Sequence, residues 1–249
     1  ADGWTFEAPR TEVMESYRYD VLADMILTAK KGLPVERPLH LFGAGHPTMF
    51  ALAVALGCDL FDSAAYALYA RENRYMTENG TWRLNELDYF PCTCPRCASE
   101  TPRELEKKTP KEREVFLAEH NLYVCIAEIK RIKQAIRDGR LYEHVEMRVH
   151  AHPALLSALK RLRNHENFLE KLSPSVKSRG FFYFDSVGLA RPEITHYRKR
   201  LNERYTPPAN SQVLLLVPQT RNKPFHKATE FKKIRQLQRG LGKELAGKV

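Results

Sequence analysis

The stretch LHLFGAGHPTMFALAVALGCDLFD, residues 39–62, decides the fold class of this chain. Residues 39–43 form a short apolar run that predicts a buried strand, and the glycines and proline that follow predict a turn into a helix over 48–56. Gly57 ends that helix, and residues 58–62 predict a second buried strand. A strand, a helix and a strand without a hairpin turn favour parallel pairing, and hence an α/β fold.

Helical patterns lie on both sides of this stretch. Apolar residues recur at helical intervals over 17–31, and Gly32 stops the pattern. The sequences TPRE (101–104) and TPKE (109–112) each combine an N-cap threonine, a first-turn proline and a capping-box glutamate, so each predicts a helix start. The second helix should run to about Asp138. Its predicted apolar stripe comprises Leu122, Ile126, Ile129, Ile132 and Ile136.

The remainder of the first part of the chain is a mixture of loop and helix. Residues 66–88 are polar and aromatic and predict a loop or a small ribbon, with a hairpin turn at Asn79-Gly80. A further helical pattern covers 141–172 and is interrupted near Pro153.

The character of the chain changes after residue 178. A strand-like run at 181–184, a basic helix candidate at 191–204 and an apolar run at 213–217 follow one another. We therefore expect two parts, the α/β part over 1–178 and a small, incomplete, basic α/β appendage over 179–249. The end of the appendage is rich in Lys and Arg, and it is either a helix that faces nucleic acid or a solvated tail.

Composition limits the class of protein. The chain has 249 residues, of which 43% are hydrophobic, so it can bury a core and is not disordered as a whole. Its formal net charge of +10 favours an anionic partner, and nucleic acid is the first candidate. No apolar stretch approaches the roughly 18 residues that a membrane span needs, and the first ten residues lack the regions of a signal peptide. We expect a cytoplasmic protein without a membrane partner.

Cysteine spacing indicates a metal site. Three of the five cysteines, Cys92, Cys94 and Cys97, lie within six positions, and His120 follows on a predicted helix. Such a set can supply the four ligands of a structural zinc ion, with no open position for a catalytic water. Cys125 lies about 140° round the helix from His120, so we do not expect it to be a ligand. The alternative is that these cysteines are ordinary buried thiols.

An aspartate at a strand end is the candidate for catalysis. Asp62 ends the second predicted strand, and the carboxyl ends of parallel strands carry the chemistry of α/β barrels and sheets. The alternative for Asp62 is a helix cap or a turn residue, and the same alternative holds for Asp59.

Two further segments are candidates for contacts with RNA or a base. Gly43 and Gly45, followed by His46, would let a ligand approach the backbone closely, or they only make a tight turn. Arg71, Arg74 and Tyr75 lie in the aromatic region and would contact phosphate and base, unless that region is a solvated loop.

Four short sequences together resemble those of archaeal tRNA-guanine transglycosylases. They are HLFGAGHP (40–47), GCDLFDSA (57–64), CTCPRC (92–97) and HNL (120–122). The resemblance extends from about Val13 to Leu172. It implies part of a (β/α)8 barrel of the TIM type with a zinc-binding insertion.

The resemblance also implies a reaction. Enzymes of that family exchange a guanine in the tRNA D-loop for 7-cyano-7-deazaguanine during archaeosine biosynthesis, without ATP. By this resemblance Asp62 attacks the ribose C1′ carbon and forms a covalent intermediate, which the incoming base displaces. The residues that match the zinc ligands of the family are Cys92, Cys94, Cys97 and His120.

Part of the family pattern has no counterpart before Val13. The amino-terminal half of the barrel, with a second catalytic aspartate and the base pocket, is not matched, and the carboxyl-terminal PUA domain is not visible. We expect the chain to be a fragment or one part of a split enzyme, working with an amino-terminal half or in a homo-oligomer. The remaining alternative is a non-catalytic, zinc-stabilised subunit that binds tRNA or the partner enzyme.

Overall fold

The computed structural model divides the chain into two compact units, Ala1–Arg198 and Lys199–Val249. It describes the backbone of 4–7 and residues 17–174, 180, 182–209, 211, 212, 216 and 225–240. The boundary predicted after residue 178 lies outside the described residues. No helix in the described part of the chain is long and apolar enough to span a membrane.

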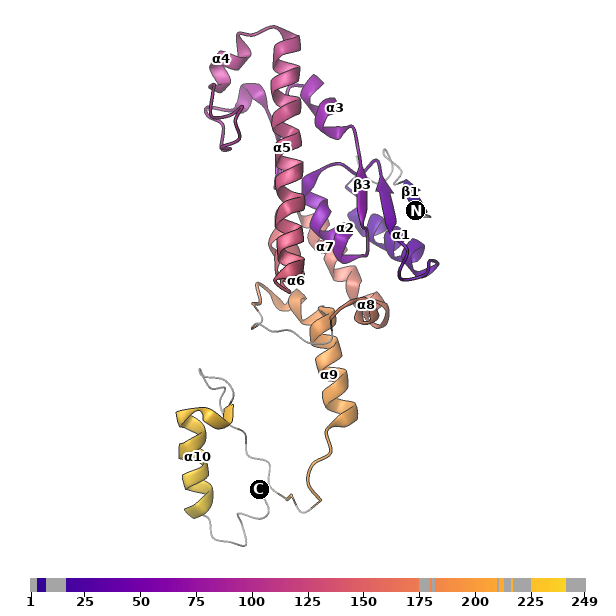
Figure 1. The fold of residues 1–249 in the computed structure, drawn as a ribbon, viewed down its shortest axis with the longest axis vertical. Helices are drawn as coiled ribbons and strands as arrows, with labels where there is room; N and C mark the ends of the chain where they lie inside the picture. Colours follow the sequence, from indigo (N-terminus) through magenta and orange to yellow (C-terminus); the bar gives the residue numbers. More distant parts are fainter. Residues whose placement is uncertain are drawn as a thin grey trace. The chain divides into compact units, whose positions relative to one another are not determined.

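A three-stranded parallel sheet organises the first unit. Its strands are β1 (Trp4–Glu7), β2 (Leu39–Phe42) and β3 (Leu60–Asp62), in the order β1-β2-β3. Helix α1 (Tyr19–Lys31) connects β1 to β2, and a short turn with α2 (Phe50–Ala55) connects β2 to β3 (Figure 1). The predicted strand-helix-strand unit and its parallel pairing are confirmed, whereas β1 was not expected.

The two faces of the sheet differ. Leu41 is fully buried beneath the helices, and its register partner Phe61 packs on Phe50 of α2 with ring centroids 4.8 Å apart. On the opposite face, Phe42 is 40% exposed and Leu60 is 55% exposed. Helices therefore cover one face of the sheet, and the described strands form an α/β layer rather than a closed barrel.

A small metal-site region follows the sheet. It contains α3 (Ala65–Arg71), the antiparallel hairpin of β4 (Arg74–Thr77) and β5 (Gly80–Arg83), and α4 (Pro102–Glu106). A hairpin turn is present as predicted, but it lies one position earlier, at Glu78-Asn79, because Gly80 already pairs with Thr77 as the first residue of β5. Helix α3 is a finding that the polar and aromatic sequence did not predict.

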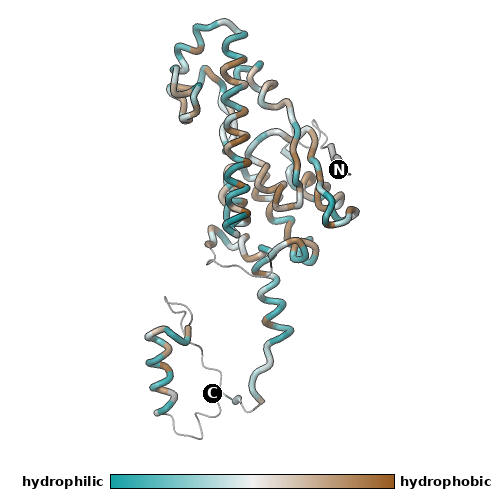
Figure 2. The backbone as a smooth tube through the Cα atoms, in the orientation of Figure 1, coloured by the Kyte–Doolittle hydropathy of each residue, from teal (hydrophilic) through white to brown (hydrophobic). Residues whose placement is uncertain are grey.

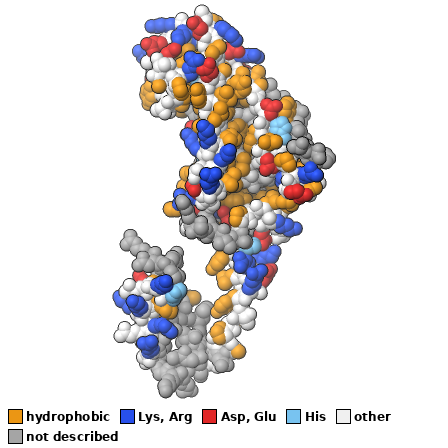
Figure 3. Space-filling model, in the orientation of Figure 1, with side chains coloured by type: hydrophobic (Ala, Val, Ile, Leu, Met, Phe, Trp, Pro, Cys, Tyr) orange, Lys and Arg blue, Asp and Glu red, His pale blue; other side chains and the backbone are white. Residues whose placement is uncertain are grey.

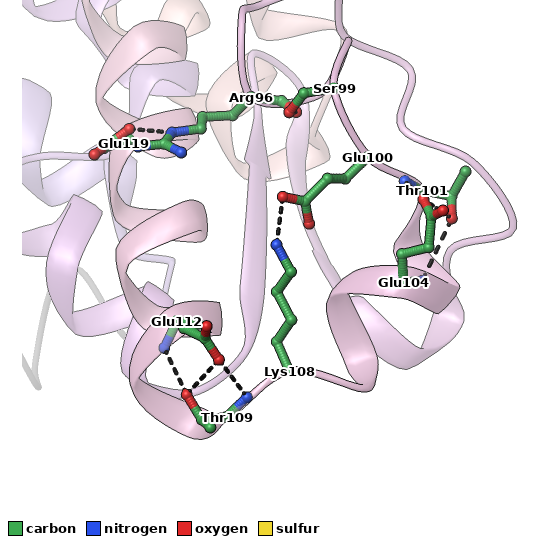
Figure 4. Close-up of polar contacts among 9 residues, drawn as sticks. All are labelled: Arg96, Ser99, Glu100, Thr101, Glu104, Lys108, Thr109, Glu112 and Glu119. Atoms are coloured by element: carbon green, nitrogen blue, oxygen red, sulfur yellow. Dashed lines mark hydrogen bonds and ion pairs between the residues drawn. The ribbon is translucent and has the colours of Figure 1, made fainter.

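Helix α5 (Pro110–Arg137) runs along the side of the first unit from α4 to α6 (Figure 1). Both predicted capping boxes are present (Figure 4). Thr109 Oγ1 accepts a hydrogen bond from Glu112 N at 3.3 Å, while the Glu112 carboxylate accepts one from Thr109 N at 2.9 Å. After the helix, Gly139 adopts a φ of +65°, which a residue without Cβ adopts most easily.

The helices after α5 complete the core of the first unit. They are α6 (Leu141–Val149), α7 (Pro153–Arg161) and α8 (Glu166–Leu172). Helix α6 packs on α2 and α7 packs on α1.

The strand predicted at 181–184 is wrong for residues 182–184, and Phe181 lies outside the described residues. The buried Arg191 side chain donates to Phe182 O at 2.7 Å, and Phe184 N donates to the Glu146 carboxylate at 3.3 Å. Side chains of α6 and Arg191 therefore take the backbone bonds that a neighbouring strand would have made.

The basic helix predicted over 191–204 is confirmed as α9 (Pro192–Arg204). It is coloured mostly as hydrophilic in Figure 2. The boundary between the two units falls within α9, and the second unit contains α10 (Thr229–Gly240). Phe231 of α10 contacts Phe225, which precedes the helix, with ring centroids 5.1 Å apart. The strand predicted at 213–217 lies outside the described residues apart from Leu216.

A buried charge cluster joins α5 to α6. The Glu128 carboxylate has no solvent exposure and accepts from Arg148 at 2.8 and 2.9 Å and from His144 Nε2 at 2.7 Å. Burial by itself raises the pKa of Glu128, but the hydrogen bonds from His144 and Arg148 outweigh it and lower the pKa to about 2. The folded state therefore favours the charged form of Glu128.

We expect Thr109→Ala to lower the free energy of unfolding by about 1 kcal/mol, because the substitution leaves a backbone N–H of the first turn without its cap. Urea unfolding measures this loss. Thr28→Ala is the matched control, since Thr28 is exposed within α1, caps no helix, and its hydroxyl donates to Asp24 O one turn earlier. A control loss as large as that of Thr109→Ala would contradict the capping argument.

We expect Glu128→Gln to lower the free energy of unfolding by about 3 kcal/mol or more at pH 7, because the guanidinium of Arg148 loses its buried anionic partner. The folded pKa of Glu128 is depressed to about 2 from an unfolded value near 4.3, so this stabilisation is present above pH ~4.3 and is lost as the pH falls towards 2. Urea unfolding of both proteins from pH 7 to 3 should therefore show a narrowing difference; a constant difference is incompatible with the assigned charge state.

Candidate metal centre and adjoining cavity

The four residues predicted as metal ligands lie together. Their ligand atoms are all within 4.8 Å of one another. His120 Nδ1 is 3.2 Å from Cys97 Sγ and 3.5 Å from Cys94 Sγ. Ligand atoms bound tetrahedrally at about 2.3 Å from zinc are roughly 3.7 Å apart, so the cluster has the size that a zinc ion needs.

The second nitrogen of His120 fixes which atom faces the sulfurs. Met76 O lies 2.9 Å from His120 Nε2, and because a carbonyl only accepts, Nε2 carries the proton and Nδ1 presents its lone pair to the cysteines. Burial lowers the pKa of His120 to about 4, so the imidazole is neutral at pH 7, as a metal ligand must be. Burial also raises the pKa of Cys97, which favours a protonated thiol unless a cation displaces the proton.

A small aromatic core supports the ligands. Tyr75 stacks on the His120 ring with centroids 3.7 Å apart, and its hydroxyl lies 3.4 Å from Cys97 Sγ. Phe90 stacks on the other side of this group, 5.3 Å from Tyr75. The cysteine loop is tied to α5 by the ion pair between Arg96 and Glu119, the residue before His120 (Figure 4).

The remaining cysteines are separate from this cluster. Cys125 Sγ is 3.7 Å from Gly45 O, and Cys58 is buried in the main core of the first unit. The sequence prediction that Cys125 is not a ligand agrees with this arrangement.

An open cavity of about 430 Å³ lies beside β3 and α5. Asp62, at the carboxyl end of β3, lines it together with Tyr66 of α3 and with Lys130 and Lys133 of α5. Asp62 O accepts a hydrogen bond from Gly43 N at 2.8 Å, so the loop after β2 holds the end of β3. Figure 3 shows hydrophobic side chains gathered on the face between α5 and the sheet, beside a column of Lys and Arg.

The apolar stripe predicted on α5 is not a closed core. Ile132 is buried, but Leu122 is 41% exposed, Ile126 is 44% exposed, and both line the cavity of Asp62. The helical period was predicted correctly, whereas the role of the stripe as a cavity wall was not. Tyr66 and the two lysines were also missed, and only their place on the elements that follow Asp62 would have indicated them.

The glycines predicted to approach a ligand lie in the loop after β2. Gly43 has a φ of +79° and is exposed. A Cβ on Gly45 would lie 2.1 Å from Ser63 Oγ, so the loop after β3 requires glycine there. His46 caps the following turn by accepting from Thr48 N at 3.3 Å.

The two arginines predicted to contact RNA have protein partners. Arg71 donates to Glu114 of α5 at 3.1 Å. Arg74 lies over the Tyr69 ring, 4.7 Å from its centroid, and donates to Thr81 at 3.2 Å. The Tyr69 ring also lies 5.9 Å from His46, so Arg74 and His46 are brought near each other, whereas Arg71 points to α5.

Asp59, the other acidic residue considered for catalysis, has a structural position. Its carboxylate accepts from Leu39 N at 2.9 Å and pairs with the buried Lys30 at 3.6 Å. It therefore fixes the start of β2.

Comparison with known proteins gives consistent matches over most of the chain. Residues 3–154 match the family model described as TGT, queuine tRNA-ribosyltransferase. A tRNA-guanine(15) transglycosylase of Methanocaldococcus jannaschii is 52% identical over 218 residues, which are 86% of this chain and 33% of that protein. A protein of the same name from Methanosarcina mazei is 51% identical, and the match covers 88% of this chain and 44% of that protein. Another from Haloferax volcanii is 53% identical, and the match covers 82% of this chain and 39% of that protein. The chain thus spans less than half the length of these relatives.

We expect Cys94→Ser to reduce the zinc content, about one ion per chain for the unaltered protein, to near zero and to lower the unfolding temperature. Elemental analysis of protein purified without added metal, together with thermal unfolding, measures both effects. Cys125→Ser is the matched control and should keep its zinc. Equal zinc contents in the two variants would contradict the ligand assignment.

Proposed function

Because the chain belongs to the queuine tRNA-ribosyltransferase family, we propose that it is the part of a tRNA-guanine transglycosylase that carries the nucleophilic carboxylate and a structural zinc. The observation that carries the proposal is the position of Asp62, at the carboxyl end of a parallel strand and on the wall of an open cavity. The identity to archaeal tRNA-guanine(15) transglycosylases supports tRNA as the substrate, with exchange of a D-loop guanine for 7-cyano-7-deazaguanine in archaeosine biosynthesis.

The proposed reaction consists of two displacements at one carbon. The Asp62 carboxylate attacks the ribose C1′, the bond between C1′ and the guanine nitrogen breaks, and its electron pair leaves with guanine, which takes up a proton. The incoming base loses a proton and displaces the carboxylate, so two inversions retain the sugar configuration. An anion beside the anomeric carbon also stabilises the oxocarbenium-like charge that develops there. Lys130 and Lys133 line the same cavity and favour the approach of a phosphate backbone.

The proposed fold is part of a (β/α)8 barrel that requires further strands. Parallel sheets are normally covered on both faces, yet Phe42 and Leu60 are exposed on one face of this sheet. Among the described strands, β3 pairs only with β2, and the exposed Leu122 and Ile126 line the same cavity as Phe61 and Asp62 of β3. These features support completion by an amino-terminal half, which is supplied by the same polypeptide, by a separate chain or within a homo-oligomer.

We propose that the zinc ion is structural and stabilises the fold of the cysteine loop rather than taking part in catalysis. Cys92, Cys94, Cys97 and His120 fill four positions, so the ion would tie the cysteine loop to α5 without an open position for water. We further propose that residues 1–178 form the barrel part, whereas 179–249 form a basic appendage that contacts the tRNA backbone, as the net charge of +10 favours. In the first unit, Arg71, Arg74 and His46, with the loop of Gly43 and Gly45, are the proposed contacts with RNA or base.

The net charge of +10 also supports a second candidate function, that of a zinc-stabilised subunit that binds tRNA without forming a covalent bond to it. The two functions differ in one product, the covalent adduct between protein and tRNA.

We expect the unaltered chain, combined with the amino-terminal half of a relative, to give a tRNA adduct that survives a denaturing gel, and Asp62→Asn to abolish it. Asp88→Asn, in an exposed loop of the same unit, is the matched control and should keep the adduct. An adduct with Asp62→Asn would refute the nucleophile assignment. Binding of tRNA by the unaltered protein without an adduct would favour the subunit without catalysis.

A further inference from the structure

One buried amide side chain connects three elements around the metal centre. Asn121 has no solvent exposure. Its Oδ1 accepts from Met76 N of β4 at 2.8 Å, and its Nδ2 donates to Tyr66 O of α3 at 3.0 Å and to Arg74 O at 3.2 Å. Since all three partners are backbone groups with fixed roles, they determine which end of the amide is oxygen.

Asn121 directly follows the ligand His120, and the two side chains hold the same peptide unit of β4. His120 Nε2 donates to Met76 O, while Asn121 Oδ1 accepts from Met76 N. Both backbone groups of Met76 are therefore bonded to α5. A metal that fixes His120 Nδ1 would fix the ring, and with it this edge of the hairpin.

The same amide reaches the wall of the cavity. Tyr66 lies in the first turn of α3, lines the cavity together with Asp62, and is four positions beyond it in the chain. The short link between them is ordered, because Ser63 Oγ accepts from Ala65 N at 3.0 Å and Gly43 N donates to Asp62 O at 2.8 Å. The position of Asp62 thus depends on β2 before it and on α3 after it.

We propose that Asn121 is a positioning residue that couples metal binding at the cysteine loop to the placement of α3 and of Asp62. The coupling is a property of the fold, and its consequence for catalysis rests on the proposed function. A nucleophile must lie about 3 to 3.5 Å from the carbon it attacks, and a displacement of about 1 Å costs roughly 100-fold in rate. Loss of the link should therefore lower kcat far more than it weakens tRNA binding.

The first test uses amide hydrogen exchange of the whole chain and requires no activity. Chelation of zinc from the unaltered protein should accelerate exchange in α3 by about tenfold or more, in step with the cysteine loop, while α1 and α7 stay protected. Asn121→Asp, which keeps the acceptor for Met76 N and loses both donated bonds, should release α3 even with zinc retained. Asn121→Ala should do the same.

Leu155→Ala in α7 is the matched control, because it removes a fully buried side chain of the main core of the first unit. It should lower overall stability without selective release of α3. If chelation leaves α3 protected, or releases α1 and α7 equally, the coupling is refuted, and this holds even if the Asn121 variants fail to fold. Unchanged α3 exchange in a zinc-loaded Asn121→Asp protein refutes it as well.

The second test separates this proposal from the proposed function. With the amino-terminal half present, base exchange by Asn121→Asp should show a kcat about 100-fold lower, with KM for tRNA changed less than about threefold. An inactive unaltered protein whose α3 responds to chelation would remove the proposed reaction and leave the coupling intact. If the unaltered protein is active and Asn121→Asp is equally active, the proposed reaction is supported and the coupling of Asn121 to the placement of Asp62 is refuted.

Discussion

The metal-site region depends on the hydrogen bonds that His120 and Asn121 make to one peptide unit, that of Met76. A two-stranded hairpin is at best marginally stable in water, and the buried apolar cluster beneath this one is small. Its stability therefore depends on cross-links in addition to the burial of this cluster. The side chains of α5 supply one set of cross-links, and the cysteines around His120 supply the geometry for another.

Features that are determined within a few residues could be predicted from the sequence. The threonine caps of α4 and α5, the presence of a hairpin turn just before Gly80 and the order of β2, α2 and β3 all depend on local backbone preferences. The grouping of the four candidate metal ligands could also be predicted, because three cysteines in six positions need only one further ligand from a nearby helix. The position of Asp62 at a strand end follows from the same local order.

Features that depend on distant partners could not be predicted. Strand β1 exists through its pairing with β2, more than thirty positions along the chain. Gly45 belongs to a GxG sequence of the kind found in ligand loops, but a Cβ at this position would overlap Ser63 Oγ, which explains why the position requires glycine. Arg71 and Arg74 were predicted to contact RNA from their charge and their place in an aromatic segment, and neither feature reveals the partners Glu114 and Tyr69.

The exposed apolar surface links the completion of the fold to the completion of the site. Phe42 and Leu60 share one face of the sheet with Asp62, and Leu122 and Ile126 line the cavity beside it. A polypeptide that covered these side chains would also close the cavity around the carboxylate and remove water from it. Because charges interact more strongly in a dry site of low dielectric constant, the same association would stabilise the sheet and strengthen the interaction of Asp62 with a developing positive charge. The open side of this unit is thus the side on which stability and the proposed chemistry would depend on the same contacts.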